Sequence, residues 1–223
     1  MTEPAANTAP YPATADQRIL DTAITLAERV GWEAVRFADV ADALGIGLDD
    51  IRRHYREKEA IADAWFDRAD AVMLQAAAGE RAKLLPELER VEDCIIAWLG
   101  ALDTHRRVTR EIILNKLEPG HLHVQIPAVL RISRTVQWVR EACGRPQTFV
   151  LRALDESVLT TLFVTTFAYW LLNPRDNLQA TRRFLHRLLR LAAAFGRLPP
   201  LPRLLRLLDA RAGRAASRRR GAH

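Results

Sequence analysis

Apolar residues recur at helical spacing along most of the chain. The first such stretch begins after Thr14-Ala-Asp-Gln17, which has the spacing of a capping box, and ends at Gly31. Its apolar stripe is expected to comprise Ile19, Leu20, Ala23, Leu26, Ala27 and Val30. A short helix is predicted over 38–44, a glycine-containing turn over 45–47 and a second short helix over 48–54. Two short helices joined by such a turn predict a helix-turn-helix.

Longer helices are expected in the rest of the chain, which makes the predicted fold class all-α. Uninterrupted stretches predict helices over 59–84, 87–117, 126–143, 147–172 and 174–195, with Asn173 as the N-cap of the last one and Pro174 as its first residue. In that last helix a packing seam repeats at steps of three and four residues: Leu178, Thr181, Leu185, Leu188, Ala192 and Phe195. The seam is longer than the interior of one subunit needs, so we predict a homodimer with Leu178, Leu185, Leu188, Ala192 and Phe195 at its interface.

Positive charge is concentrated at the C-terminal end of the chain. From Arg197 onward there are eight arginines and one aspartate, whereas 14–56 holds six arginines and eight acidic residues. The net charge of +6 therefore does not by itself indicate nucleic-acid binding, and the case for DNA rests on local geometry. In the tail, leucines fall on one helical face and arginines on the opposite face. This pattern suits a helix on an anionic membrane, or a helix docked on the core and followed by a disordered basic end.

Several classes of function lack their motifs in this sequence. Cys94 and Cys143 lie far apart without metal-ligand spacing, so we interpret them as buried free thiols in a reducing cytoplasm. The first thirteen residues lack the features of a targeting signal and are expected to be a disordered leader. The most apolar run, 158–172, is shorter than the ~20 residues that span a bilayer. No phosphate loop, catalytic triad motif or metal-ligand set is present, so we expect neither an enzyme nor a cofactor.

The stretch from Arg18 to Ile61 resembles the DNA-binding domain of the TetR family of transcriptional regulators. Twelve positions match the family pattern in register: Gly31, Val40, Ala41, Leu44, Gly45, Ile46, Ile51, His54, Tyr55, Lys58, Glu59 and Ile61. Two features depart from that pattern. Arg52 stands where the family usually has tyrosine, and Asp49-Asp50 place negative charge at the start of the second short helix. Such acids suit a helix cap, but they repel phosphate.

The resemblance implies a reading helix in the major groove of double-stranded DNA. The candidates for base contact or groove lining are Gly47, Leu48, Arg52 and Arg53, and those for contact with the DNA backbone are His54, Tyr55, Arg56 and Lys58. The alternative for the arginines is a solvated helix face. The domains expected are a leader over 1–13, a three-helix helix-turn-helix domain over 14–60, a helical ligand-binding and dimerisation domain over 61–196, and a tail over 197–223.

The same resemblance implies a homodimer on a palindromic operator, with a small apolar effector or lipid in the C-terminal domain. Large side chains there are candidates to line its pocket: Trp98, Trp138, Phe163, Phe167 and Trp170. The alternative for each is a place in the core or at the dimer interface.

The segment 149–189 also resembles the lipid-binding accessory proteins of ubiquinone biosynthesis, which are built on the TetR fold. The shared features are Tyr169-Trp170-Leu171, Ala180-Thr181 and Phe184-Leu185. Two hypotheses follow: a ligand-responsive DNA-binding repressor, or a lipid-binding protein that contacts the membrane through its basic tail. The acidic N-terminal domain and the tail favour the second, whereas the intact turn and the residues after it favour the first, which we adopt.

Overall fold

The computed structural model describes residues 14–116, 122–143, 156–175 and 177–196, without the side chains of 116, 122–130, 156, 195 and 196. The described residues form ten α-helices and no strand, which confirms the predicted all-α class. In chain order they are α1 (Ala15–Val30), α2 (Phe37–Leu44), α3 (Leu48–His54), α4 (Lys58–Ala78), α5 (Glu80–Leu84), α6 (Glu87–Asp103), α7 (Arg106–Lys116), α8 (Leu122–Ala142), α10 (Glu156–Leu172) and α11 (Leu178–Gly196). The predicted leader and tail lie outside these residues.

The chain packs as two compact units. The first contains the described residues of Met1–Val72 and Trp98–Leu130, and the second contains those of Met73–Ala97 and Arg131–His223. The division falls within α4, α6 and α8, so these three helices contribute to both units. The domain boundaries expected from the sequence stay a prediction.

Helix α1 starts as its sequence predicts. The Thr14 backbone N–H donates to Gln17 Oε1 at 3.1 Å, and the Gln17 N–H donates to Thr14 Oγ1 at 3.4 Å, which completes the capping box. The buried face comprises Ile19, Leu20, Ala23, Ile24 and Ala27. Placing Val30 in this stripe was wrong: it is the last residue of the helix, is 59% exposed and lines a surface hollow.

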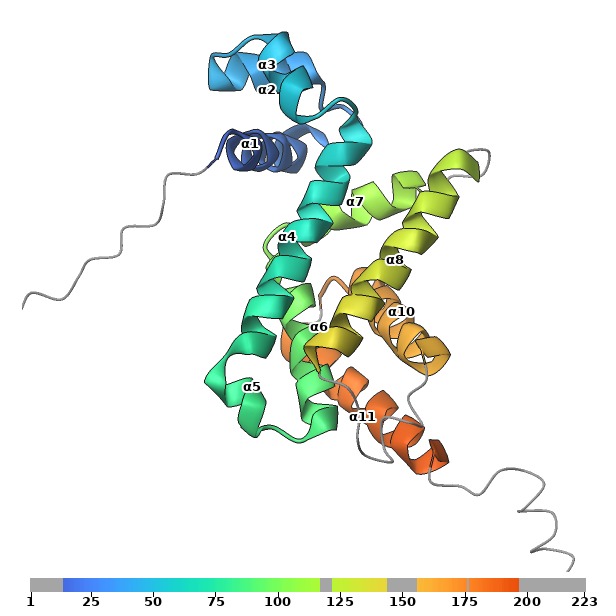
Figure 1. Cartoon of the computed structure of the whole chain (residues 1–223). Helices are drawn as coiled ribbons and strands as arrows, with labels where there is room; N and C mark the ends of the chain where they lie inside the picture. Colours follow the sequence, from blue (N-terminus) through green and yellow to red (C-terminus); the bar gives the residue numbers. More distant parts are fainter. Residues whose placement is uncertain (1–13, 117–121, 144–155, 176, 197–223) are drawn as a thin grey trace, which may run out of the picture. The chain divides into compact units, whose positions relative to one another are not determined.

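The first three helices form one cluster. Helix α1 packs against α2 and α3, and α2 packs against α3, as the blue and cyan elements of Figure 1 show. Val40 and Ala41 of α2 and Ile51 of α3 are buried, and they supply the apolar contacts of the cluster. This cluster is the helix-turn-helix that the sequence predicts.

Two of the long helices predicted from the sequence are interrupted. The stretch 59–84 breaks at Gly79, whose extended backbone (φ −64°, ψ 150°) starts the separate helix α5. The stretch 87–117 breaks after Asp103, where the His105 N–H donates to the Leu102 carbonyl oxygen at 3.1 Å in a turn. Predicting single helices here was wrong, because that prediction relied on strong helix breakers and neither break contains a proline.

The last helix begins later than predicted. Asn177, not Asn173, is its N-cap, because the Asn177 Oδ1 accepts the Ala180 N–H at 3.0 Å. Asn173 instead ends α10, where its Nδ2 donates to the Tyr169 carbonyl oxygen at 2.7 Å. The neighbouring α10 and α11 pack together (Figure 1). The Tyr169 and Phe184 rings are stacked, with centroids 4.2 Å apart. The predicted start of α10, at 147, lies outside the described residues, and α8 begins at Leu122 rather than 126.

Candidate nucleic-acid interface

The turn between α2 and α3 is a glycine-ended helix stop. Gly45 adopts the left-handed conformation (φ 65°, ψ 35°), which favours glycine because it has no Cβ. Its N–H donates to the Asp42 carbonyl oxygen at 3.2 Å, and the Ile46 N–H donates to that of Ala41 at 3.1 Å. These two bonds are those of a Schellman motif, so the sequence fixes where α2 ends and how the chain enters α3.

Helix α3 starts at Gly47 and presents an exposed first turn. The Gly47 N–H donates to Asp50 Oδ2 at 3.1 Å, so one of the two acids near the helix start acts as a cap. Leu48, the first helical residue, is 56% exposed. Ile51 anchors α3 to the core, with only 1% of its surface exposed. Helix α3 is therefore held in the core while its first turn stays exposed.

The two arginines of α3 are paired with the acids at its start. Asp49 accepts from Arg52 at 2.8 Å and from Arg53 at 2.9 Å, and Arg53 also donates to Asp50 at 2.7 Å. Hydrogen bonds from Arg52, and then from Arg53, lower the pKa of the Asp49 carboxyl. All four side chains are well exposed, so these pairs are weak and can exchange for phosphate or base contacts.

The end of α3 is tied to the start of α1. His54 Nδ1 contacts the Asp16 carboxylate, and the Tyr55 hydroxyl donates to the Asp16 carbonyl oxygen at 3.2 Å. Tyr55 is only 7% exposed, and burial raises the pKa of its hydroxyl. Among the predicted backbone contacts, His54 thus lies at the surface, whereas Tyr55 is largely a core residue.

Arg56 and Lys58 follow α3 but differ in exposure. Arg56 is exposed, whereas Lys58, the first residue of α4, is half-buried. The Lys58 Nζ donates to the Glu33 carbonyl oxygen at 2.9 Å and lies 5.0 Å from the centroid of the Trp32 ring. Burial lowers the pKa of this amine. Lys58 therefore stabilises the connection between α1 and α2. The sequence predicted only a phosphate contact for this residue.

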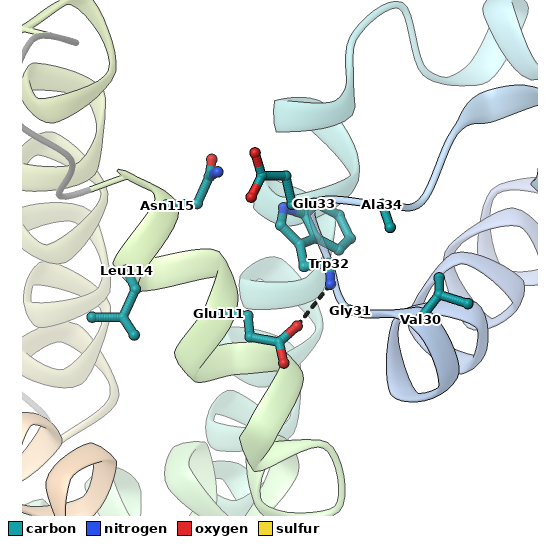
Figure 2. Close-up of a pocket in the computed structure, with 8 residues that line it drawn as sticks. All are labelled: Val30, Gly31, Trp32, Glu33, Ala34, Glu111, Leu114 and Asn115. Atoms are coloured by element: carbon teal, nitrogen blue, oxygen red, sulfur yellow. Dashed lines mark hydrogen bonds between the residues drawn. The ribbon is translucent and has the colours of Figure 1, made fainter.

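That connection also contacts α7 at a surface hollow of about 560 Å³. Figure 2 shows its lining residues: Val30, Gly31, Trp32, Glu33, Ala34, Glu111, Leu114 and Asn115. The Trp32 N–H donates to Glu111 Oε2 at 2.7 Å, drawn as a dashed line. Gly31 has φ 87° and ψ 150°, a conformation that only glycine adopts readily, and so turns the chain toward Glu111.

Arg107 adds a second link between α7 and α1. Its guanidinium donates to the carbonyl oxygens of Ala27, at 3.1 Å, and Glu28, and it lies 3.4 Å from the Glu28 carboxylate. These are carbonyls of the last turn of α1, where cationic donors are favourable. It also pairs with Glu111 at 2.9 Å. These links could not be predicted from the sequence, because Trp32 and Glu111 lie 79 positions apart.

The side chains predicted to line an effector pocket are divided between the two units. Trp98 lies in the first unit, where its Nε1 donates to Asp70 Oδ1 at 2.8 Å. Phe163, Phe167 and Trp170 form a buried stack along α10 in the second unit, with ring centroids 6.3 and 5.9 Å apart. The fifth residue, Trp138 of α8, is 44% exposed.

The predicted dimer residues differ in their exposure within one chain. Leu185 is fully buried, whereas Leu178, Leu188 and Ala192 are partly exposed. The side chain of Phe195 lies outside the described residues. Among the described side chains of α11, the most exposed large apolar one is Leu191, at 55%. The predicted seam did not include it.

Comparison with solved structures identifies the family of the chain. The chain is 46% identical to a TetR transcriptional regulator from Nitrosomonas europaea, with a TM-score of 0.73, over 81% of this chain and 99% of that one. The chain belongs to the TetR family of transcriptional regulators. More distant neighbours show the same fold: a TetR regulator from Rhodococcus sp. RHA1 (20% identity, TM-score 0.54, 82% and 95% coverage) and a fatty acid degradation regulator from Bacillus halodurans (14%, 0.61, 81% and 96%). Comparison with family models and with curated proteins gives no match.

TetR membership makes the chain a DNA-binding transcriptional regulator with a helix-turn-helix, a class whose members are generally not enzymes. The comparisons do not favour the lipid-binding accessory alternative. Among the described residues, none of the helices combines the length and apolar character needed to cross a membrane.

Proposed function

We propose that this TetR-family protein is a ligand-responsive repressor that binds a palindromic operator as a homodimer and reads it through α3. The observation that carries the proposal is that α3 combines a buried anchor with exposed side chains. Ile51 holds the helix in the core, while the Leu48 and Arg52 side chains are exposed. A helix fixed in this way presents defined side chains to the major groove. In a dimer the two reading helices would lie about one DNA turn, ~34–36 Å, apart.

The proposed DNA contacts divide into two kinds. Gly47, Leu48, Arg52 and Arg53 are assigned to base edges or groove lining, because they occupy the first turns of the reading helix. The residues assigned to the DNA backbone are His54, Tyr55, Arg56 and Lys58. Backbone contacts carry no sequence information, so the two groups should respond differently to substitution.

Salt-dependent binding of duplex DNA tests this division. Arg52→Ala should alter sequence preference, whereas Lys58→Ala should weaken all duplexes similarly and reduce the salt slope by about one. Arg81→Ala is the matched control, because this arginine is 83% exposed on α5, outside the helix-turn-helix. Since Lys58 also braces Glu33, its variant is compared at a temperature where circular dichroism shows full folding. An unchanged preference in Arg52→Ala would contradict the proposed reading role.

The homodimer is proposed to form through α10 and α11. From Ser157 to Leu172, α10 carries no charged residue, and its buried stripe leaves an uncharged opposite face. Val164 and Leu172 on that helix are 39% and 70% exposed, and Leu191 adds an apolar side chain from α11. A helix that is apolar all round is typically buried, so a second copy of the chain is the partner that this surface fits.

The effector is proposed to be a small apolar molecule held among the aromatic side chains of α10. The effector can change DNA affinity only by as much as its own affinity differs between the DNA-binding and non-binding conformations of the protein. The Glu111 and Arg107 links are proposed to make α1 to α3 follow any displacement of α7. A panel of hydrophobic compounds, screened by thermal shift and then by release of operator DNA, tests this. Compounds that stabilise the protein without changing DNA affinity would contradict ligand response.

The basic tail, 197–223, is proposed to bind an anionic surface. Membrane lipid and DNA phosphate are both anionic, and a chain that lacks 201–223 distinguishes binding of one from binding of the other. Loss of binding to anionic vesicles would indicate a membrane role, with affinity that falls as salt shortens the Debye length. Weaker duplex binding with an unchanged consensus would indicate a DNA role. Equal binding of both surfaces by the shortened and full chains would contradict the proposal.

A further inference from the structure

Two cysteines meet in the second unit. Cys94 lies on α6 and Cys143 directly follows α8, and their sulfur atoms are 3.8 Å apart although 49 positions separate them in the chain. Only 2% and 5% of their surfaces are exposed. The sequence predicted buried free thiols, which the structure confirms, but it gave no reason to expect that the two sulfurs are neighbours. Both belong to one compact unit, so their proximity is a property of that unit.

The two thiols are not equivalent. The Cys143 S–H donates to the Cys94 sulfur, and this hydrogen bond lowers the pKa of Cys94 while it raises that of Cys143, which burial raises further. Burial and the Asp93 carboxylate oppose the lowering of the Cys94 pKa, whereas Arg90 supports it. The Arg90 Nη1 also donates to the Cys143 carbonyl oxygen at 3.2 Å. Cys94 is therefore the better nucleophile, and Cys143 is close enough to react with an oxidised Cys94 sulfur.

We infer that Cys94 and Cys143 are a thiol pair that hydrogen peroxide oxidises to a reversible intramolecular disulfide. The Cys94 thiolate attacks one peroxide oxygen, the O–O bond breaks, and the departing hydroxide takes up a proton to become water. The Cys143 thiol then attacks the sulfenic sulfur of Cys94 and gives its proton to the displaced hydroxide, which leaves as a second water. Two thiols lose two electrons and two protons, and one peroxide is reduced to two waters.

The geometry permits this bond with a small movement. A disulfide needs its sulfurs ~2.05 Å apart, so the two atoms must approach by about 1.8 Å. Burial excludes bulky thiols and oxidants, and it makes a small uncharged peroxide the oxidant class that fits. The reaction is slow, because peroxide reaches Cys94 only when the unit opens locally. The inference does not depend on DNA binding and is tested without DNA.

Peptide mapping of the full chain gives the first test. The protein is treated with hydrogen peroxide, its remaining thiols are blocked with N-ethylmaleimide, and it is digested with trypsin without reduction. We expect a linked pair of peptides, 91–106 with 141–152, that separates on addition of dithiothreitol. Two free thiols, or links only between chains, would overturn the inference. This test needs no variant, so a folding defect cannot obscure it.

The order of the two steps gives the second test. In Cys143→Ser, peroxide should leave a sulfenic acid on Cys94 that dimedone captures once the treated protein is unfolded in urea. Under the same conditions Cys94→Ser should label at least several-fold less. Cys94→Ala and Cys143→Ala, checked by circular dichroism, serve as apolar controls for the buried sites. Equal labelling of the two cysteines would overturn the assignment of Cys94 as the attacking thiol.

Discussion

Replacing Glu111 with alanine tests the contact that joins the helix-turn-helix to α7. Glu111 accepts the Trp32 N–H at 2.7 Å across 79 positions of sequence, and it pairs with Arg107 at 2.9 Å. Trp32 is only 5% exposed, so its amide has little access to water when the carboxylate is removed. Arg107 keeps its hydrogen bonds to the α1 carbonyl oxygens in this variant, so the main interaction lost is the hydrogen bond of the Trp32 amide.

The magnitude follows from the kind of hydrogen bond. A bond to a charged acceptor contributes about 1.5–3 kcal/mol, and a buried donor left without a partner loses its solvation as well. We therefore expect Glu111→Ala to lower the free energy of unfolding of the first unit by about 2–3 kcal/mol. Glu111→Gln keeps an acceptor oxygen but loses the charge, so its cost should be about 1 kcal/mol.

Urea denaturation followed by circular dichroism measures the stability, and hydrogen exchange of the peptide that contains Trp32 measures the local effect. Glu80→Ala is the matched control: this glutamate also pairs with a basic residue, Lys83 at 2.5 Å, but is 87% exposed. Its removal should change stability by less than about 0.5 kcal/mol. In Glu111→Ala we expect faster exchange at the Trp32 amide, whereas the α10 and α11 amides should keep their protection.

Equal stability of the Glu111→Ala and Glu80→Ala proteins would refute this reasoning. So would unchanged exchange at the Trp32 amide, because it would mean that the carboxylate does not hold that connection.

Four further substitutions test other contacts. Asp49→Asn removes the carboxylate that pairs with both arginines of α3 and competes with DNA for them, so duplex affinity at low salt should increase about two- to fivefold. Asp42→Asn on α2 is the charge-matched control. Equal duplex affinity of the two variants by fluorescence anisotropy would contradict this competition. Leu191→Glu should give folded monomers by sedimentation, because the Leu191 side chain is 55% exposed. An unchanged dimer in this variant would place the interface elsewhere. Leu185→Ala should lower stability in thermal unfolding by about 2–5 kcal/mol, because the Leu185 side chain is fully buried. Gly45→Ala should destabilise the protein by about 1–2 kcal/mol in urea, since φ is 65° although no atom blocks the added carbon.

Local signals allowed much of the fold to be predicted. The Thr14 capping box, the Gly31 stop and the Gly45 turn depend only on residues close in sequence, and all three were predicted correctly. The break at Gly79 was missed because no proline marks it. Asn173 was mistaken for an N-cap because a nearby proline resembles a helix start, whereas Asn177 makes the bond.

The site could be predicted only where it is local. The position of α3 and the candidate contact residues followed from the family pattern, but the pairing of Arg52 and Arg53 with Asp49 was not anticipated. Lys58 was assigned to phosphate from its position alone, and its bond to Glu33 depends on how α1 and α4 pack. The approach of Cys94 to Cys143 likewise arises from tertiary packing, which residue types and spacing do not encode in a single sequence.

Selection of bound fragments from a random double-stranded DNA library by the purified full chain tests the central claim most directly. The account predicts enrichment of a palindromic consensus whose half-sites are centred about one helical turn apart, and loss of preference at the contacted base pairs in Arg52→Ala. Recovery of fragments without any shared sequence, at low salt where binding is strongest, would contradict a sequence-reading α3.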